Sequence, residues 1–223
     1  MDHLMVFDID GTLINVQGAG HRAMDRAFTD FYGVAHAFEG ISFAGQTDRG
    51  ALNLAAQRHH VTIRSEDLHT FQTLFASHLQ EELQRAPGHV LPGLPDLLFL
   101  LQSEGFYLAL GTGNFKISAY LKLAPFDMAG FFPAGGFGDD GITRLEVLTY
   151  AIKRAATHYQ KTWDRVTVFG DTPGDMQAAR SLQAFGLGVA TGPYSKAELE
   201  SGGAQAVLND LSNLDSVRKQ LGS

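Results

Sequence analysis

Short hydrophobic runs that end in Gly or Asp recur along the chain and predict buried β-strands. Most of these runs show no alternation of polar and apolar residues, which is typical of strands that are buried on both faces. The clearest runs cover residues 4–7, 107–110, 166–169 and 185–189, with a weaker one at 206–208.

Helical patterns separate the predicted strands, at residues 92–104, 115–123, 144–158 and 174–181. Strands that alternate with helices form parallel sheets with helices on both faces. We therefore predict an α/β fold with a Rossmann-like parallel sheet as its core. Binding sites in such folds form in the loops at the carboxyl ends of the strands.

One long segment interrupts this alternation. From about Asn15 to Pro87 no run is typical of a strand, whereas residues 20–32, 49–59 and 65–85 have helical patterns. We predict an α/β core formed by residues 1–15 and 87–223, and an inserted all-helical cap formed by residues 16–86. Phe residues at helical spacing favour a hydrophobic core within this cap over a ligand cage. They are Phe28, Phe31, Phe38, Phe43, Phe71 and Phe75.

Composition narrows the class of protein. A length of 223 residues suits one large domain or a core domain with an insert. The formal net charge of -7 makes nucleic acid and anionic membranes poor partners, and the lack of Cys excludes disulfides and thiol nucleophiles. Neither a secretory signal nor a membrane-spanning run is visible. We expect a soluble cytoplasmic protein, as a monomer or a homodimer.

Two carboxylates, Asp8 and Asp10, follow the first predicted strand and precede a Gly turn. They point to the same side of an extended strand. Like charges about 4 Å apart repel by about 4 kcal/mol at an effective dielectric constant near 20. A divalent cation or a proton would offset this repulsion, although a polar strand end that merely turns through Gly is the alternative.

Polar residues also follow two other predicted strands. Gly111-Thr112-Gly113-Asn114 offers a hydroxyl and backbone N–H groups before a helix, which suits an anion, although Thr112 or Asn114 as a simple helix cap is the alternative. Asp171 and Asp175 follow the strand at 166–169. The alternative for Asp175 is a structural role in a turn or as a helix cap. Such a role explains Asp171 less well.

A basic residue lies near this edge of the predicted sheet. Thr143-Arg144-Leu145-Glu146 matches a capping box, with Thr143 as the N-cap and Glu146 reaching back to it. Arg144 then lies in the first helical turn, where the helix dipole disfavours a cation. Arg144 therefore either has an anionic partner or faces water.

Together, an acid pair, a hydroxyl, a base and a further acid group resemble the motifs of the haloacid dehalogenase superfamily of phosphohydrolases. The helical insert is similar to the cap of that family, and the closest likeness is to phosphoglycolate phosphatase-like members. The motifs fall on Asp8, Asp10 and Thr12, on Thr112, on Arg144, and on Gly170, Asp171 and Asp175.

Two positions depart from the family pattern. The third motif usually offers Lys, so Lys153 competes with Arg144, although it would lie two to three turns inside the helix. The acid that usually follows the first motif is replaced by Ile14-Asn15-Val16.

The resemblance implies a Mg²⁺-dependent hydrolase of a small phosphorylated substrate that acts through an aspartyl phosphate. Asp8 would be the nucleophile and Asp10 the general acid and base. Thr112 would donate to the phosphate, with Gly113 and Asn114 beside it, and Arg144 would balance charge. The implied metal ligands are the side chains of Asp8 and Asp171 and the carbonyl oxygen of Asp10. Asp175 would act through a water molecule or by contacting one of these ligands.

Substrate specificity is expected from a loop of the predicted cap, where Gln46 and Thr47 precede a helix. The alternative is that Thr47 or Asp48 only caps that helix. His21 is expected to be structural or solvated. Three other functions share this pattern: a phosphomutase, a metal-independent dehalogenase and a non-catalytic sensor of phosphorylated metabolites.

Overall fold

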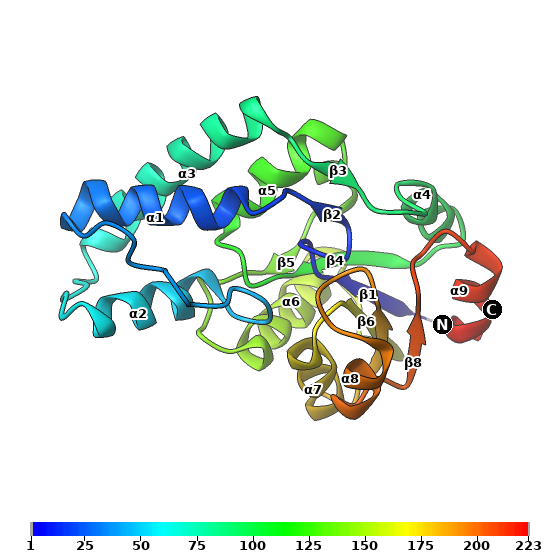
Figure 1. The fold of residues 1–223 in the computed structure, drawn as a ribbon. Helices are drawn as coiled ribbons and strands as arrows, with labels where there is room; N and C mark the ends of the chain where they lie inside the picture. Colours follow the sequence, from blue (N-terminus) through cyan, green and yellow to red (C-terminus); the bar gives the residue numbers. More distant parts are fainter. Residues whose placement is uncertain (1, 223) are drawn as a thin grey trace.

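The computed structural model describes residues 2–222 and contains a six-stranded parallel sheet. The strand order is β5-β4-β1-β6-β7-β8, which confirms the predicted α/β class. The strands are β1 (His3–Phe7), β4 (Tyr107–Gly111), β5 (Gly135–Gly136), β6 (Arg165–Gly170), β7 (Phe185–Val189) and β8 (Ala206–Leu208). Figure 1 shows the chain termini at one end of the sheet, away from the first three helices.

Strand β1 lies in the middle of the sheet, between β4 and β6. Phe7 is in register with Leu110 of β4 and with Phe169 of β6. Because the three strands are parallel and in step, the residues that follow them meet at one edge. This register brings Asp8, Thr112 and Asp171 together from segments that lie far apart in the sequence.

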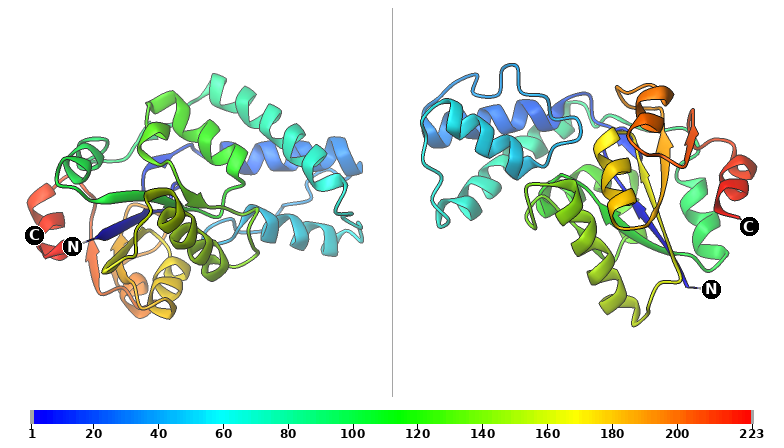
Figure 2. Two further views of the ribbon diagram at one scale, coloured as in Figure 1. Left: turned by 180° about the vertical axis from the view of Figure 1, so that it is seen from behind. Right: turned by 90° about the horizontal axis from the view of Figure 1, so that it is seen from below.

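Both faces of the sheet are covered by helices, which explains the hydrophobic runs without alternation (Figure 2). Leu4 and Val6 of β1 pack in a cluster with α6 and α7, whereas Met5 and Phe7 pack in a cluster with α4 and α9. The helices of the core are α4 (Asp96–Ser103), α5 (Lys116–Leu123), α6 (Arg144–Tyr159), α7 (Pro173–Ser181), α8 (Lys196–Ser201) and α9 (Leu214–Leu221), with short 3-10 turns at Ala124–Phe126 and Ala129–Phe131.

The predicted core helices are confirmed, with differences at their ends. The helix predicted from residue 92 begins only at Asp96, because residues 92–95 form a turn. Strand β5 and helices α8 and α9 were not predicted. Strand β5 consists of two glycines, so it has no hydrophobic run to reveal it.

Three helices follow β1, as the sequence predicts: α1 (Ala19–Tyr32), α2 (Asp48–Arg58) and α3 (Asp67–Arg85). They lie together beyond the carboxyl ends of the strands (Figure 1). Two short strands flank these helices in the sequence, β2 (Ile14–Asn15) before them and β3 (His89–Val90) after them. The two strands pair with each other in antiparallel orientation. We had predicted no strand between about Asn15 and Pro87, but Asn15 is the second residue of β2. A strand of two residues is too short to produce a hydrophobic pattern in the sequence.

The Phe residues of α1–α3 and their loops pack in one hydrophobic cluster. Phe28, Phe38, Phe71 and Phe75 are fully buried, and the ring of Phe75 meets that of Phe115 on α5 at 6.2 Å. The cluster is therefore continuous with the core of the sheet, whereas we had predicted a separate hydrophobic core within the helical insert. Phe43 differs because it lies in the loop before α2 and lines the cavity described below.

Within residues 2–222, no helix combines the length and the hydropathy needed to cross a membrane.

Candidate active site

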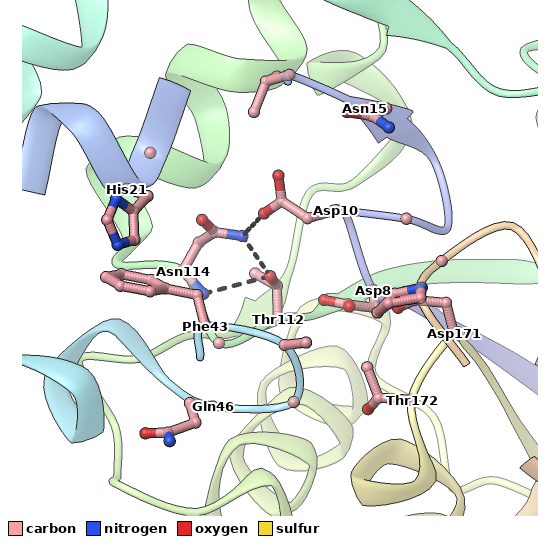
Figure 3. A pocket seen from close by; sticks show the side chains of 18 of the residues that line it. Asp8, Asp10, Asn15, His21, Phe43, Gln46, Thr112, Asn114, Asp171 and Thr172 are labelled. Atoms are coloured by element: carbon pink, nitrogen blue, oxygen red, sulfur yellow. Dashed lines mark hydrogen bonds between the residues drawn. The ribbon is translucent and has the colours of Figure 1, made fainter. Parts of the chain in front are cut away.

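A cavity of about 500 Å³ opens between the carboxyl ends of the strands, the start of α1 and the loop before α2 (Figure 3). The strand ends, the start of α6 and the loop before α2 all contribute to its lining. The sequence-predicted site residues that line it are Asp8, Asp10, Gln46, Thr112, Gly113, Asn114, Arg144 and Asp171.

Three buried carboxylates meet below this cavity. Asp8, Asp171 and Asp175 each offer an oxygen, and these atoms all lie within 4.8 Å of one another. Burial, with the nearby carboxylates of Asp8 and Asp175, raises the pKa of Asp171 to about 9. Burial also raises the pKa of Asp175 to about 6, against the opposing effect of Arg144. The cluster therefore holds more negative charge than its surroundings easily stabilise.

Arg144 is the buried cation of this cluster. Its Nη2 atom lies 2.7 Å from Asp8 Oδ2, and its Nε atom lies 2.9 Å from Asp175 Oδ1. Burial lowers the pKa of Arg144, but the carboxylates of Asp175 and Asp8 outweigh this and raise it. Arg144 begins α6 after the predicted capping box of Thr143 and Glu146, which is present. The anionic partner expected for a cation in a first helical turn is thus the acid cluster.

Lys153, the competing candidate, lies elsewhere. It is exposed on α6 and lines a separate surface pocket with Tyr150 and Arg154. The helix carries residue 153 more than two turns from its start, away from the strand ends.

The acid cluster has the features of a cation site. One guanidinium faces three carboxylates, and two buried oxygens, Asp171 Oδ1 and Asp175 Oδ1, accept no hydrogen bond within the described residues. Gly11, at a φ of +80°, passes so close that a Cβ there would lie 2.2 Å from Asp171 Oδ2. Hard divalent cations bind such carboxylate oxygens. These residues could therefore hold a metal ion.

Asp175 has a second role, as its position in the sequence suggested. It is the third residue of α7, where its Oδ2 accepts a hydrogen bond of 2.7 Å from Thr172 Oγ1 in a capping box. One carboxylate oxygen thus caps the helix while the other belongs to the acid cluster.

Asp10 lies apart from the acid cluster. Its Oδ2 accepts a hydrogen bond of 2.8 Å from Asn114 Nδ2 and pairs with Lys122 Nζ at 2.6 Å. The side chain of Asp10 is therefore bound by Asn114 and Lys122, and the expected role of its carbonyl oxygen as a metal ligand stays a prediction. Lys122 was not among the site residues predicted from the sequence. The sequence does contain a signal, because Lys122 is a charged residue at a position that lies on the same face of α5 as the apolar residues Ala119 and Leu123.

Thr112 is fully buried and does not cap α5. Its Oγ1 accepts hydrogen bonds from the backbone N–H and from Nδ2 of Asn114, at 3.3 and 2.8 Å (Figure 3). The hydroxyl proton of Thr112 is therefore available to another acceptor. The capping alternative is wrong for both Thr112 and Asn114.

The start of α5 is capped instead by Asp48, from the first turn of α2. Its Oδ2 accepts hydrogen bonds from Phe115 N at 2.8 Å and from Ser118 Oγ at 3.2 Å. The backbone N–H of Asp48 also donates to Gly113 O at 2.7 Å. Burial raises the pKa of Asp48 to about 6, against the opposing charge of Lys122. These contacts tie the loop before α2 to the core beside the cavity.

The expected specificity residues separate in the structure. Gln46 lines the cavity, but Thr47 is buried and does not; its hydroxyl caps α2 by accepting from Gly50 N at 3.0 Å. The prediction of Thr47 as a substrate contact is therefore wrong, because the helix uses its hydroxyl. His21 lines the cavity with its ring against Phe43, at 4.8 Å.

Comparison with known proteins connects this site with a family. The family model of haloacid dehalogenase-like hydrolases matches residues 3–183. A curated relative, the probable phosphatase IndB of Dickeya dadantii (strain 3937), is 24% identical over 96% of this chain and 92% of its own length.

Solved structures share the fold over the whole chain. A hydrolase from Pseudomonas syringae aligns over 100% of both chains, with 24% identity and a TM-score of 0.72. A predicted phosphoglycolate phosphatase from Haemophilus somnus 129pt covers 96% of each chain, with 18% identity and a TM-score of 0.68. A putative β-phosphoglucomutase from Thermotoga maritima covers 98% of this chain and 99% of its own, with 20% identity and a TM-score of 0.65.

Proposed function

This chain belongs to the haloacid dehalogenase-like hydrolase family, and we propose that it is a Mg²⁺-dependent phosphatase of small phosphomonoesters. The observation that carries the proposal is the buried cluster of Asp8, Asp171 and Asp175, paired with Arg144 and placed at the cavity. The name of the Dickeya relative as a probable phosphatase supports the same reaction.

The proposed reaction has two steps at Asp8. A carboxylate oxygen of Asp8 bonds to phosphorus as the ester P–O bond breaks, and Asp10 gives a proton to the leaving oxygen. Water then bonds to phosphorus as the Asp8–phosphorus bond breaks, and its proton returns to Asp10. The net change converts a phosphomonoester and water into an alcohol and inorganic phosphate.

The remaining residues bind the phosphate and balance its charge. Thr112 and Gly113 line the cavity, while Arg144 holds Asp8 in place through its ion pair. We assign the third-motif role to Arg144 on this contact. Phosphoryl transfer depends chiefly on such positioning and charge stabilisation.

The acid cluster and the backbone carbonyl of Asp10 would hold Mg²⁺, which would neutralise charge on the phosphoryl group. Asp171 provides a buried oxygen without a hydrogen bond, whereas Asp175 is committed to Arg144 and to its helix cap. We therefore propose Asp8 and Asp171 as side-chain ligands and Asp175 as a residue acting behind them.

Magnesium is expected to stabilise the protein more at high pH than at low pH. The pKa values of Asp175 (about 6) and Asp171 (about 9) exceed the ordinary value of 3.8. Without metal, both carboxyl groups are protonated in the folded and the unfolded protein below pH 3.8, and their contribution to stability is then complete. Above pH 3.8 the unfolded protein ionises first, so this stability is lost as the pH rises to about 6 for Asp175 and about 9 for Asp171. Bound Mg²⁺ removes this penalty, since it stabilises the ionised carboxylates.

The measurement is the melting temperature with Mg²⁺ or with EDTA, at pH 6 and pH 9. The increase caused by Mg²⁺ should be larger at pH 9 and should shrink in Asp171→Asn. An equal or smaller increase at pH 9 would contradict this electrostatic picture of the cluster.

Phosphate release from a panel of small phosphomonoesters tests the proposed function. The cavity of about 500 Å³ suits compact metabolites, and 2-phosphoglycolate belongs in the panel because one structural neighbour is described as a predicted phosphoglycolate phosphatase. We expect release that requires Mg²⁺. Conversion of a sugar phosphate into its isomer without free phosphate would support a mutase, and tight ligand binding without turnover would support a sensor. Turnover of a haloacid without metal would support a dehalogenase.

The cytoplasmic location and the monomeric or homodimeric state expected from the sequence stay predictions.

A further inference from the structure

Lys122 is a buried lysine whose ammonium group lies at the edge of the active-site cavity. It is 5% exposed and comes from the last turn of α5, outside the four motifs. Its Nζ atom lies 2.6 Å from Asp10 Oδ2 and 2.6 Å from Asn114 Oδ1. A cation that touches the proposed general acid is a candidate for a role in the reaction.

A contribution to the stability of the fold does not by itself explain a lysine at this position. Ala119 and Leu123 flank it on the buried face of α5. Removing an ammonium group from water is unfavourable, and a buried ion pair often stabilises a fold no better than apolar residues of similar volume. The contacts of Lys122 with the cavity residues therefore call for another explanation.

Lys122 determines which oxygen of Asp10 is free. Lys122 and Asn114 both bind Oδ2, and no hydrogen bond from the described residues reaches Oδ1. The Asp10 side chain remains 42% exposed, whereas the Lys122 side chain is only 6% exposed. The carboxyl group is thus held by one oxygen, while the other can exchange a proton in the cavity.

Lys122 also orients the amide of Asn114. An ammonium group can only donate, so it requires the oxygen of that amide and turns Nδ2 toward Asp10 Oδ2 and Thr112 Oγ1. Since Thr112 accepts from Asn114, its own proton points elsewhere. One ammonium group therefore sets the hydrogen-bond directions of three cavity residues.

The first helix covers this arrangement. A Cβ atom added at Gly20, in the first turn of α1, would lie 3.2 Å from Lys122 Nζ. Limited access to water strengthens the attraction between Lys122 and Asp10. The ion pair is therefore held between the core and the helix above it.

We propose that Lys122 is a positioning residue for proton transfer by Asp10, which rests on the proposed function. When Asp10 Oδ1 gives its proton to the leaving oxygen, the ester P–O bond breaks and the electron pair stays with that oxygen. The new carboxylate of Asp10 is stabilised by Lys122, which keeps its own protons. Oδ1 takes a proton back from the water that releases phosphate from Asp8.

The test compares two esters in Lys122→Met, which keeps an unbranched side chain one atom shorter but removes its charge. An alkyl phosphate needs a proton on its leaving oxygen, whereas p-nitrophenolate leaves without one. We expect kcat/KM to fall at least about 10²-fold more for the alkyl ester than for p-nitrophenyl phosphate, whose smaller loss reports only the orientation of Asn114 and Thr112. Lys116→Met, at the exposed start of the same helix, should change neither.

A double-mutant cycle shows whether Lys122 acts through Asp10. In an Asp10→Asn background, Lys122→Met should lower the rate with the alkyl ester no more than it lowers the rate with p-nitrophenyl phosphate when Asp10 is present, because the group whose proton transfer it supports is gone. If Lys122→Met does not fold by circular dichroism, Lys122→Gln is used in the same comparison.

Equal losses with both esters, or additive losses in the cycle, would overturn the proposed role of Lys122. A wild-type protein that releases phosphate from no ester would instead contradict the proposed function, so the two failures are distinguishable.

Discussion

Replacing Asp8 by Asn is expected to lower kcat by about 10⁴-fold or more while the fold remains intact. The amide has nearly the same size as the carboxylate, but its oxygen is a poor nucleophile. Asp8 lies directly after β1, and its backbone N–H donates to Phe169 O at 3.0 Å. This backbone contact does not depend on the side chain, so the strand end should stay in place.

Stability should respond differently from activity in this variant. Asp8 contributes one of three clustered carboxylates, so its neutral replacement weakens their mutual repulsion as well as the ion pair with Arg144. We expect a melting temperature without metal close to that of the wild type, and a smaller increase on adding Mg²⁺. Phosphate release and thermal melting with and without Mg²⁺ are the measurements.

Asp127→Asn is the matched control for Asp8→Asn. Asp127 is exposed, and its φ of +55° is one that Asn readily adopts. This variant should keep full activity. Substantial phosphate release by Asp8→Asn would refute the assignment of the nucleophile.

Replacing Arg144 by Ala is expected to lower kcat/KM by about 10²–10³-fold, as for the loss of one charge-stabilising group. It removes the guanidinium that contacts Asp8 at 2.7 Å and Asp175 at 2.9 Å. Breaking a buried ion pair from one side also destabilises a fold by about 3–5 kcal/mol. We expect Mg²⁺ to restore part of this stability, because it supplies positive charge to the same carboxylates, but not the activity.

Two further variants make this prediction specific. Arg144→Lys keeps the charge but has a single nitrogen for two partners, so it should recover only part of the rate. Lys153→Ala should have wild-type activity, because Lys153 lies in a different pocket. If Lys153→Ala lowers the rate by orders of magnitude and Arg144→Ala does not, the assignment of Arg144 is wrong. Initial rates at saturating Mg²⁺ and urea unfolding measured with EDTA distinguish these outcomes.

The motif residues could be predicted because each is tied to a local pattern. Asp8 and Asp171 follow hydrophobic runs that could only be buried strands, and Arg144 follows a capping box that places it in the first turn of a helix. A parallel sheet gathers such strand ends at one edge, so their meeting follows from the class of fold.

The partners of other site residues could not be predicted, whether they lie in a distant segment or in the same helix. Asp48 had the pattern of a simple helix cap, but it caps α5, which begins 68 positions later, at Lys116. Thr47 had the composition of a ligand contact, but its hydroxyl is used by its own helix. Local pattern cannot distinguish these uses, since both residues suit either one.

The sequence by itself determined the class of fold, the helical segment after the first strand, and the acids, hydroxyl and guanidinium of the proposed site, because hydrophobic periodicity and capping act over a few residues. Only the tertiary structure decided that Arg144 and not Lys153 contacts Asp8, and that Lys122 holds Asp10 and Asn114. These contacts depend on register and on the packing of helices, which bring Arg144 to Asp8 and Lys122 to Asp10 across more than a hundred positions.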